Sequence, residues 1–334
     1  MRFFSLLYFI CAFLLCAVPV SAETADDRLL TELLWPGISN APADKRPAVG
    51  VALAGGGARA FTHTGFLQAM QYSSFPIDYV AGTSMGSVIG AYYAAGKSID
   101  DLWNLGGKLV KLGIKKDFLN IKLLSLIFAN KMMPAQNIQR IIEGMFGDTN
   151  IEDLPKPFAC VAVDVRTGEK VVFRKGPVAL AVRSSANFPG FFEPLPYNQR
   201  YLIDGGVVEN IPVDVVKAMG ADWIIASVDK VESDSMPSNV LTVLLQVIDV
   251  RGGMLAEESI KKADFVVDPP VGSISTIAFE KSLEAAEAGL SQTVKDMPAM
   301  KRAYITKALP YVSGIEELHG AYGAAGTMAG GIKK

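Results

Sequence analysis

The stretch DYVAGTSMGSVIGAYYAAG, residues 78–96, carries the pattern that decides the fold. It opens with a short apolar run typical of a strand and ends in a run of small and apolar residues typical of a helix. Gly82-Thr83-Ser84-Met85-Gly86 joins the two. A strand that leads at once into a helix is a building unit of sheets covered by helices. The stretch therefore predicts an α/β fold, with a serine exposed on the sharp turn between the two elements.

Further strand-like runs alternate with helical patterns on both sides of this stretch. They are AVGVALA (48–54), FACVAVDV (158–165), KVVFR (170–174), RYLIDGG (200–206), DWIIASV (222–228) and DFVVD (264–268). Several of these runs are continuously apolar, as expected of central parallel strands covered on both faces. We therefore expect one folded domain over 47–310, a polar lead-in at 23–46 and a flexible Gly/Ala-rich tail at 311–334.

The composition excludes several classes of protein. The chain has 334 residues, of which 50% are hydrophobic, so it can bury a sizeable core, and disorder is excluded for its main body. Its 32 basic and 34 acidic residues give a net charge of -2, which provides no global electrostatic reason to bind nucleic acid. Its three cysteines, two of them in the first 22 residues, provide no disulfide framework.

Residues 1–22 have the pattern of a secretory signal. Arg2 precedes an uncharged apolar run from Phe3 to Val18, and Val20-Ser21-Ala22 provides the small residues of a cleavage site. We therefore expect export to the periplasm, the membrane periphery or the medium. A retained membrane anchor and lipidation at Cys16 are the alternatives.

A glycine-rich loop, Ala54-Gly55-Gly56-Gly57-Ala58-Arg59-Ala60, follows the strand-like run at 48–54. Successive backbone N–H groups of such a loop can converge on a negative charge, either an oxyanion or a phosphate. The loop lacks the Lys-Ser/Thr ending of a phosphate loop, and Ala60 stands where a dinucleotide site has its last glycine. Asp78 opens its strand, where a ribose-binding acid would end one. An oxyanion hole is favoured, while a plain tight turn and nucleotide binding stay open.

Asp204-Gly205-Gly206 ends the strand-like run at 200–206. An aspartate between a strand end and two glycines can take a proton from a hydroxyl that approaches it, although Asp-Gly more often forms a simple turn. The chain has only two histidines, His63 just after the glycine loop and His319 in the tail. His63 precedes Ser84, which is not the order of a Ser-Asp-His triad in common α/β-hydrolases, and His319 lies in the Gly/Ala-rich tail. A Ser84-Asp204 dyad is the economical hypothesis.

The glycine loop with its arginine, the GxSxG pattern and the DGG pattern, in this order, resemble the bacterial patatin-like phospholipases. The resemblance covers about 47–290 and includes VAVDVRTGEKVVF (161–173), RSSANFPGFFEPL (183–195) and DGGVVENIPVDVVKAMGADWIIA (204–226). It implies a three-layer α/β/α fold with a mainly parallel central sheet, and a lipid acyl hydrolase that needs no metal or other cofactor. The implied site comprises the nucleophile Ser84, the proton acceptor Asp204, oxyanion donors in Gly55, Gly56, Gly57 and Ala58, and the supporting residues Arg59, Gly82, Gly86, Gly205 and Gly206. Ala54 and Ala60 depart from the residues usual at these positions.

Two segments could contact a lipid substrate or a membrane. Residues 103–133 are apolar and carry Lys108, Lys111, Lys115, Lys116, Lys122 and Lys131. They could dock on anionic lipid, act as a lid, or form a helix pair with a solvated lysine face. Phe188–Phe192 could line an acyl-chain site or belong to the core. The expected partner is a phospholipid or another lipid ester. A non-catalytic lipid-binding protein, an acyltransferase and a thioesterase are the functional alternatives.

Overall fold

The computed structural model describes residues 25–113, 136–230, 240–271 and 274–311. The predicted secretory segment at 1–22 with Cys16, the tail from residue 312 with His319, and residues 114–133 of the lysine-bearing stretch lie outside the described residues.

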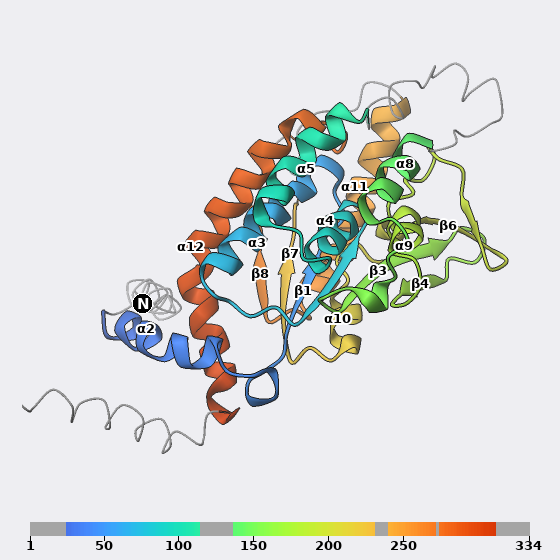
Figure 1. Ribbon diagram of the computed structural model, residues 1–334. Helices are drawn as coiled ribbons and strands as arrows, with labels where there is room; N and C mark the ends of the chain where they lie inside the picture. The colour runs from blue at the N-terminus through green and yellow to red at the C-terminus, as the bar shows by residue number, and fades with distance from the viewer. Residues whose placement is uncertain (1–24, 114–135, 231–239, 272–273, 312–334) are drawn as a thin grey trace, which may run out of the picture.

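The described strands form one eight-stranded sheet (Figure 1). Its order is β5-β6-β3-β2-β1-β7-β8, and β4 pairs with β3 beside this path. The strands are β1 (Val49–Leu53), β2 (Tyr79–Thr83), β3 (Phe158–Asp164), β4 (Lys170–Phe173), β5 (Leu195–Tyr197), β6 (Arg200–Asp204), β7 (Trp223–Ser227) and β8 (Phe265–Val267). Pairing is parallel among β3, β2, β1, β7 and β8, and antiparallel where β4 and β6 join β3 and where β5 joins β6. All seven predicted runs form strands, and the mainly parallel sheet is confirmed.

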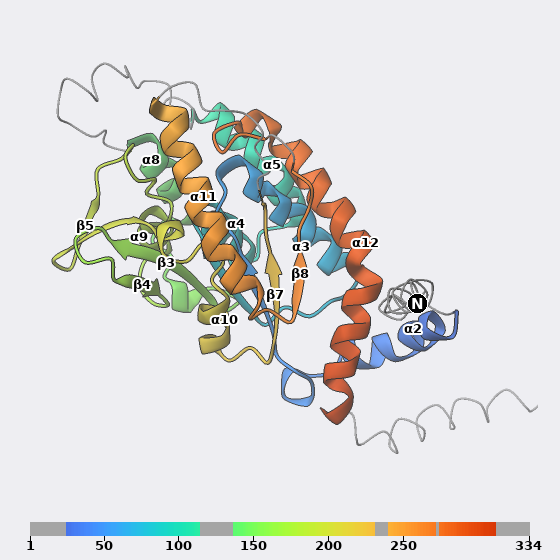
Figure 2. The ribbon, with the colours of Figure 1, turned by 180° about the vertical axis from the view of Figure 1, so that it is seen from behind.

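Helices cover both faces of the sheet, which gives the three layers. One face carries α3 (Thr62–Tyr72), α4 (Met85–Ala94), α5 (Ile99–Lys111), α8 (Gln136–Phe146), α9 (Val178–Ser185) and α12 (Ser282–Ala308). The view from behind in Figure 2 shows α10 (Val213–Met219) and α11 (Val240–Ile260) on the opposite face. Helix α2 (Ala25–Ser39) packs against α12 at the edge of the molecule.

The alternation of side chains along each strand divides the interior into two unequal cores. Val49, Val51 and Leu53 of β1 point into the larger core, under α3, α4 and α12, while Ala52 points into the smaller one. The strands present mainly alanines to the smaller core, namely Ala52, Ala81, Ala159 and Ala226. Small side chains let α10 lie close to the sheet, and a Cβ on Gly50 of β1 would collide with Val216 of this helix.

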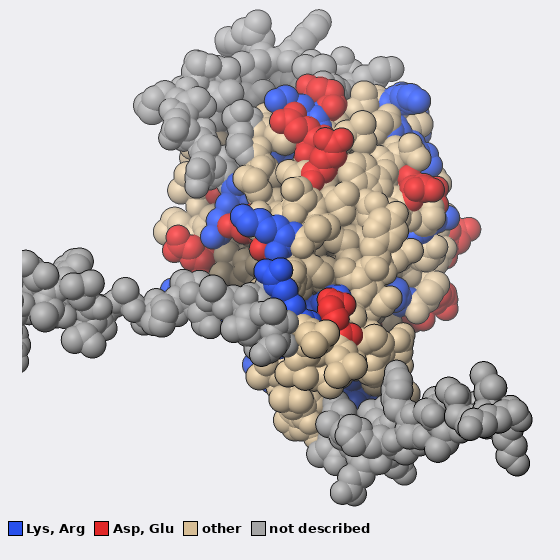
Figure 3. Space-filling model, turned by 90° about the vertical axis from the view of Figure 1, so that its left-hand side faces the viewer, with Lys and Arg blue, Asp and Glu red and all other residues tan. Residues whose placement is uncertain are grey.

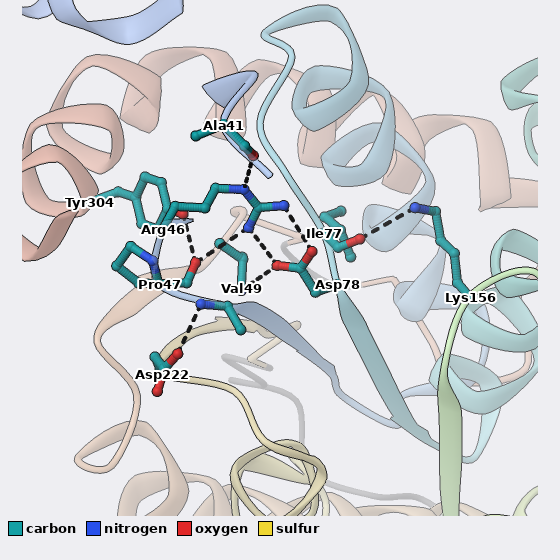
Figure 4. A network of polar contacts seen from close by, with 10 residues as sticks. Ala41, Arg46, Pro47, Val49, Ile77, Asp78, Lys156, Asp222 and Tyr304 are labelled. Carbon is teal, nitrogen blue, oxygen red and sulfur yellow. Dashed lines mark hydrogen bonds and ion pairs between the residues drawn. The ribbon is translucent and has the colours of Figure 1, made fainter. Parts of the chain in front are cut away.

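An ion pair between buried Arg46 and half-buried Asp78 fixes the amino ends of β1 and β2 (Figure 4). Arg46 donates to both carboxylate oxygens of Asp78, at 2.6 and 2.8 Å, and Asp78 also accepts the Val49 N–H at 2.7 Å. Tyr304 of α12 donates its hydroxyl to the Pro47 carbonyl at 2.7 Å. Asp78 therefore lies at the end of the sheet opposite the glycine loop, where it holds a buried guanidinium, and it cannot serve a nucleotide at that loop.

Replacing Asp78 with alanine should lower the free energy of unfolding by about 3–5 kcal/mol, because it leaves the Arg46 charge buried without a partner. Chemical denaturation measures this loss. Asp214→Ala is the matched control, since it breaks a pair with Lys262 in which both side chains are 51% exposed and should cost less than about 1 kcal/mol. Equal losses in the two variants would contradict the stabilising role of the buried pair.

The charged surface agrees with the near-zero net charge. Figure 3 shows basic and acidic side chains lying close together on the side of α12 and α2, with wide uncharged areas around them. Lys301 of α12 forms an ion pair with Glu32 of α2, at 3.4 Å. Among the described helices, none combines the length and the apolar character that a bilayer span requires.

Candidate active site

Ser84 lies on the sharp turn between β2 and α4, with φ 52° and ψ −127°. A positive φ is costly for a residue with a side chain, so the surroundings must hold this conformation in place. The flanking glycines make the turn possible, because a Cβ on Gly82 would collide with the Gly86 carbonyl and a Cβ on Gly86 with the Ala54 carbonyl. The Ser84 N–H donates to the Ser185 hydroxyl at 3.0 Å, which fixes the turn against α9.

The antiparallel course of β6 brings Asp204 to the level of Ser84. Strand β3 extends beyond the end of β2, since Thr83 pairs with Val161 and β3 continues to Asp164. Strand β6 pairs with this extension and runs back along it, so that its last residue, Asp204, falls opposite Ala162. Ser84 and Asp204, which are 120 positions apart in the sequence, therefore line the same cleft.

The Asp204 carboxyl is buried and held in a fixed position. Its Oδ1 accepts the Gly206 N–H at 2.8 Å, and its own N–H donates to the Asn187 carbonyl at 2.9 Å. Gly205 must lack a side chain because a Cβ there would collide with the Val161 carbonyl. Burial raises the pKa of Asp204 to about 6, although the Ser84 hydroxyl and the Gly206 N–H each lower it. Such a carboxyl is ionised at neutral pH and can accept a proton from a nearby hydroxyl.

The glycine loop after β1 lines this cleft with Gly56 and Gly57, whose N–H groups have no acceptor among the described residues. The Gly55 N–H donates to the Asn210 carbonyl at 3.1 Å, and the Ala58 N–H donates to the Thr276 carbonyl at 2.8 Å. Within the described part of the chain, no acceptor is found for the N–H groups of Gly56 and Gly57. Of the four predicted oxyanion donors, Gly56 and Gly57 therefore keep their N–H groups available. Gly55 and Ala58 use theirs to hold the loop.

Arg59 anchors the far side of the loop. Its guanidinium is almost fully buried, and it donates to the Thr276 hydroxyl at 2.8 Å and to Asp249 of α11 at 2.7 Å. These contacts tie the loop both to α11 and to the segment before α12. Arg59 is therefore a structural anchor of the loop.

His63 lies beneath the loop and takes no part in the cleft. Its Nε2 lies 2.9 Å from the Ala54 carbonyl and its Nδ1 lies 2.8 Å from the Ser227 hydroxyl of β7. Burial lowers the pKa of His63 to about 4, so the ring is neutral, with Nε2–H donating to Ala54 and Nδ1 accepting from Ser227. His63 therefore links the start of the glycine loop to β7.

Two pockets of different character meet at Ser84. The larger is a cleft of about 390 Å³, with polar residues that include Arg59, Asn210 and Asp229 in its walls. The smaller, of about 50 Å³, has mainly apolar walls contributed by α4, α5 and α8. Its apolar residues include Met85, Val88, Leu109, Ile138, Ile141, Ile142, Met145, Phe188 and Phe279.

The aromatic segment 188–192 is divided between the pockets and the core. Phe188 lines both pockets beside Ser84, whereas Phe191 and Phe192 are buried in the larger core. The core interpretation therefore holds for Phe191 and Phe192, while Phe188 lies where it could contact a ligand. In the described part of 103–133, Lys108 and Lys111 are exposed on α5, while Leu105 and Leu109 of the same helix are buried.

Among the residues of the cleft that were not predicted, Asn210 and Asp229 contact the glycine loop. Asn210 holds Gly55 through its backbone carbonyl, and Asp229 lies directly behind the glycine loop with 5% of its surface exposed. Asp229 follows β7, which is next to β1. Strands β2 and β3 are added on one side of β1 and β7 and β8 on the other, so the strand order reverses between β1 and β7. Residues at the carboxyl ends of strands at such a point commonly line ligand sites, and this was the available signal. No cluster of side chains suited to a metal ion is found among the described residues.

A family model for the patatin-like phospholipases matches residues 51–217, half of the chain. A patatin-like phospholipase domain-containing protein of Caenorhabditis elegans is 30% identical over 278 residues, covering 73% of this chain and 20% of that protein. An uncharacterized NTE family protein of Mycobacterium tuberculosis is 34% identical over 181 residues, covering 54% and 48%. The chain thus spans between a fifth and about half of the length of these relatives.

Solved structures give a more distant likeness. Human GIVD cytosolic phospholipase A2 in complex with methyl gamma-linolenyl fluorophosphonate aligns with a TM-score of 0.46 at 14% identity, covering 87% of this chain and 64% of that one. The family match itself starts in β1 and ends in α10, so it includes the glycine loop, the Ser84 turn and Asp204. This chain belongs to the patatin-like phospholipase family.

Proposed function

We propose that the protein is a lipid acyl hydrolase that cleaves carboxylic esters of phospholipids or lysophospholipids through an acyl-enzyme on Ser84. One observation carries this proposal. The Ser84 hydroxyl, the Asp204 carboxyl and the free N–H groups of Gly56 and Gly57 surround one cleft. A nucleophile, a proton acceptor and a pair of oxyanion donors are the groups that acyl transfer requires.

In the proposed acylation step, Ser84 Oγ attacks the ester carbonyl while Asp204 takes the hydroxyl proton. The carbonyl oxygen becomes negatively charged, and the Gly56 and Gly57 N–H groups donate to it. The tetrahedral intermediate then expels the alcohol, to which Asp204 returns the proton. In the second step Asp204 takes a proton from water, the resulting hydroxide attacks the acyl carbonyl, and Ser84 recovers its proton as the fatty acid leaves.

The two pockets support a lipid as the substrate. The apolar pocket between α4, α5 and α8, of about 50 Å³, suits the first carbons of the acyl chain, while the larger polar cleft suits the alcohol part of the ester. Because both pockets meet at Ser84, a substrate with one long apolar arm and one polar arm would place its ester at the nucleophile.

Changing Met145 to tryptophan tests the assignment of the apolar pocket. Met145 is only partly buried at the wall of this pocket, so a larger ring should narrow the pocket without disrupting the core. We expect kcat/KM for a decanoyl ester to fall about tenfold relative to that for an acetyl ester, because the longer chain loses apolar contacts. p-Nitrophenyl esters of the two acids measure this ratio.

Met254→Trp is the matched control for this change. Met254 is 62% exposed on α11 and lines the polar cleft. The same substitution there should leave the preference for chain length unchanged. If both variants shifted the ratio equally, the apolar pocket would not be the acyl-chain site.

Fluorophosphonate labelling of the full chain tests the proposed function as a whole. The wild type should acquire an adduct that peptide mass mapping places on Ser84, and it should release free fatty acid from phosphatidylcholine or lysophosphatidylcholine vesicles. Mass spectrometry of the products distinguishes hydrolysis from transfer of the acyl group to an alcohol. A folded protein that binds the vesicles without an adduct or a product would instead be a lipid-binding protein.

A further inference from the structure

Asp229 lies on the opposite side of the glycine loop from the nucleophile. A Cβ on Gly55 would approach the Ser84 side chain, and a Cβ on Gly56 would overlap the Asp229 carboxyl. The loop is therefore held between the Ser84 turn and Asp229. Gly56 must be a glycine here because the Asp229 carboxyl occupies the space of its side chain.

Little stabilises a negative charge on the Asp229 carboxyl by hydrogen bonding beyond its own backbone N–H, which lowers its pKa. It is 5% exposed, and no partner for its Oδ2 is found among the described residues. The nearby guanidinium of Arg59 donates through Nη1 to Thr276 and through Nη2 to Asp249, and no partner is found among the described residues for its Nε–H. A buried carboxylate oxygen without a donor costs far more free energy than a neutral carboxyl at the same place.

The charged groups around Asp229 do not compensate for its burial. Arg59 of the loop segment attracts its negative charge, whereas Asp249 of α11 and Asp268, which follows β8, repel it. Lys230 is next in the chain and pairs with Asp268 at 3.3 Å. Burial raises the pKa of Asp229 to about 7, Arg59 lowers it, and the two carboxylates raise it further. A large part of the protein therefore carries a neutral Asp229 near neutral pH.

We propose that Asp229 is a positioning residue of the oxyanion loop, that it acts as the neutral acid, and that its ionisation slows the acylation of Ser84. The neutral carboxyl fills the space behind Gly56 and so keeps the Gly56 and Gly57 N–H groups directed into the cleft. The ionised carboxylate places a negative charge beside the developing oxyanion and repels it. The inference rests on the proposed function, because it concerns the same Ser84 chemistry.

The pH profile of kcat/KM separates this role from a purely structural one. In the wild type, the rate should rise as Asp204 ionises around pH 6 and fall as Asp229 ionises around pH 7. Asp229→Asn keeps the shape of a neutral acid and should lose the fall, so that its ratio of rates at pH 8 and pH 6 exceeds that of the wild type by about tenfold. Asp214→Asn, on the exposed face of α10, should keep both limbs.

A second variant tests whether the shape of the neutral carboxyl matters. Asp229→Ala should be slower than Asp229→Asn at every pH, because it removes the support behind Gly56, and it should also lack the fall at high pH. A fall at high pH that persists in Asp229→Asn, or equal rates in the two variants, would overturn the proposal.

Denaturation as a function of pH provides a readout besides activity. An unfolded aspartate ionises near pH 3.9, whereas folded Asp229 ionises only near 7, so the folded state binds more protons between these values. The stability that this proton provides is present below about pH 4 and is lost as the pH rises to 7. Asp229→Asn should reduce this loss. If the wild type were neither labelled nor active at any pH, the proposed function would fail, while this measurement would still decide whether Asp229 is neutral.

Discussion

Ser84→Ala is expected to lower kcat for ester hydrolysis by on the order of 10⁴-fold or more, because it removes the atom that forms the acyl-enzyme while the rest of the site stays in place. Release of fatty acid from lysophosphatidylcholine, followed by mass spectrometry, measures the loss. Fluorophosphonate labelling should disappear in the same variant. Activity within tenfold of the wild type would exclude Ser84 as the nucleophile.

Ser84→Gly distinguishes lost chemistry from lost folding. A glycine adopts the positive φ of residue 84 without strain, so this variant should be about 1 kcal/mol more stable than Ser84→Ala and equally inactive. Ser74 provides the matched control, since it also has a positive φ, of 51°, but is exposed at the end of α3. Ser74→Gly should be more stable than Ser74→Ala, and both should keep full activity.

Asp204→Asn is expected to lower kcat by about 10³- to 10⁴-fold. The asparagine oxygen can still accept the Gly206 N–H, so the turn should persist, but the side chain no longer accepts the Ser84 proton. In the wild type, kcat/KM should rise with pH around 6, where Asp204 loses its proton, and the residual activity of the variant should not show this rise. Asp100→Asn, an exposed change in the first turn of α5, should leave the profile unaltered.

The pH dependence of the stability of Asp204→Asn provides an independent test of the role of Asp204. Because the pKa of Asp204 is raised on folding, the wild type loses stability as the pH rises from about 4 through 6, where burial of the charge sets in. The asparagine variant should lose less stability over this window and be the more stable protein at pH 7. A variant that unfolds more easily at pH 7 and has lost activity would show that Asp204 is chiefly structural.

The sequence was sufficient to locate the strands because seven of them are apolar runs bounded by turn residues. The directions of the strands were harder to predict from the sequence. Strands β3 and β4 are joined by residues 165–169 alone, a connection too short for a parallel crossover, and this spacing indicates an antiparallel pair. Strand β5 was missed because it is three residues long and contains Pro196. Its hairpin to β6 turns at Asn198 and Gln199, which both have positive φ. Such a turn is usually signalled by a glycine-containing pair such as Asn-Gly, and the sequence has no glycine at these two positions.

The site could be predicted where chemistry depends on a local pattern. Glycines stand at 82 and 86 and in the DGG at 204–206 because the backbone is crowded there, and a glycine pattern can be seen in the sequence itself. Which loop N–H groups stay free depends on Asn210 and Thr276, which lie far away in the sequence and approach only through the sheet. Asp229 was missed for the same reason, because the role of an aspartate after a strand depends on which residues surround it in the folded protein.

The order β2-β1-β7 also determines which fragment of the chain could fold on its own. The segment matched by the family model ends in α10, before β7, although β7 pairs with all five residues of β1. In a fragment of 51–217, the β7 side of β1 would therefore become an exposed sheet edge. Its unpaired N–H and C=O groups could then pair with another copy of the fragment. It would also lack Asp229 and Ser227, whose hydroxyl donates to His63 under the glycine loop. The smallest piece able to fold on its own must therefore extend past the end of the family-model match and include β7.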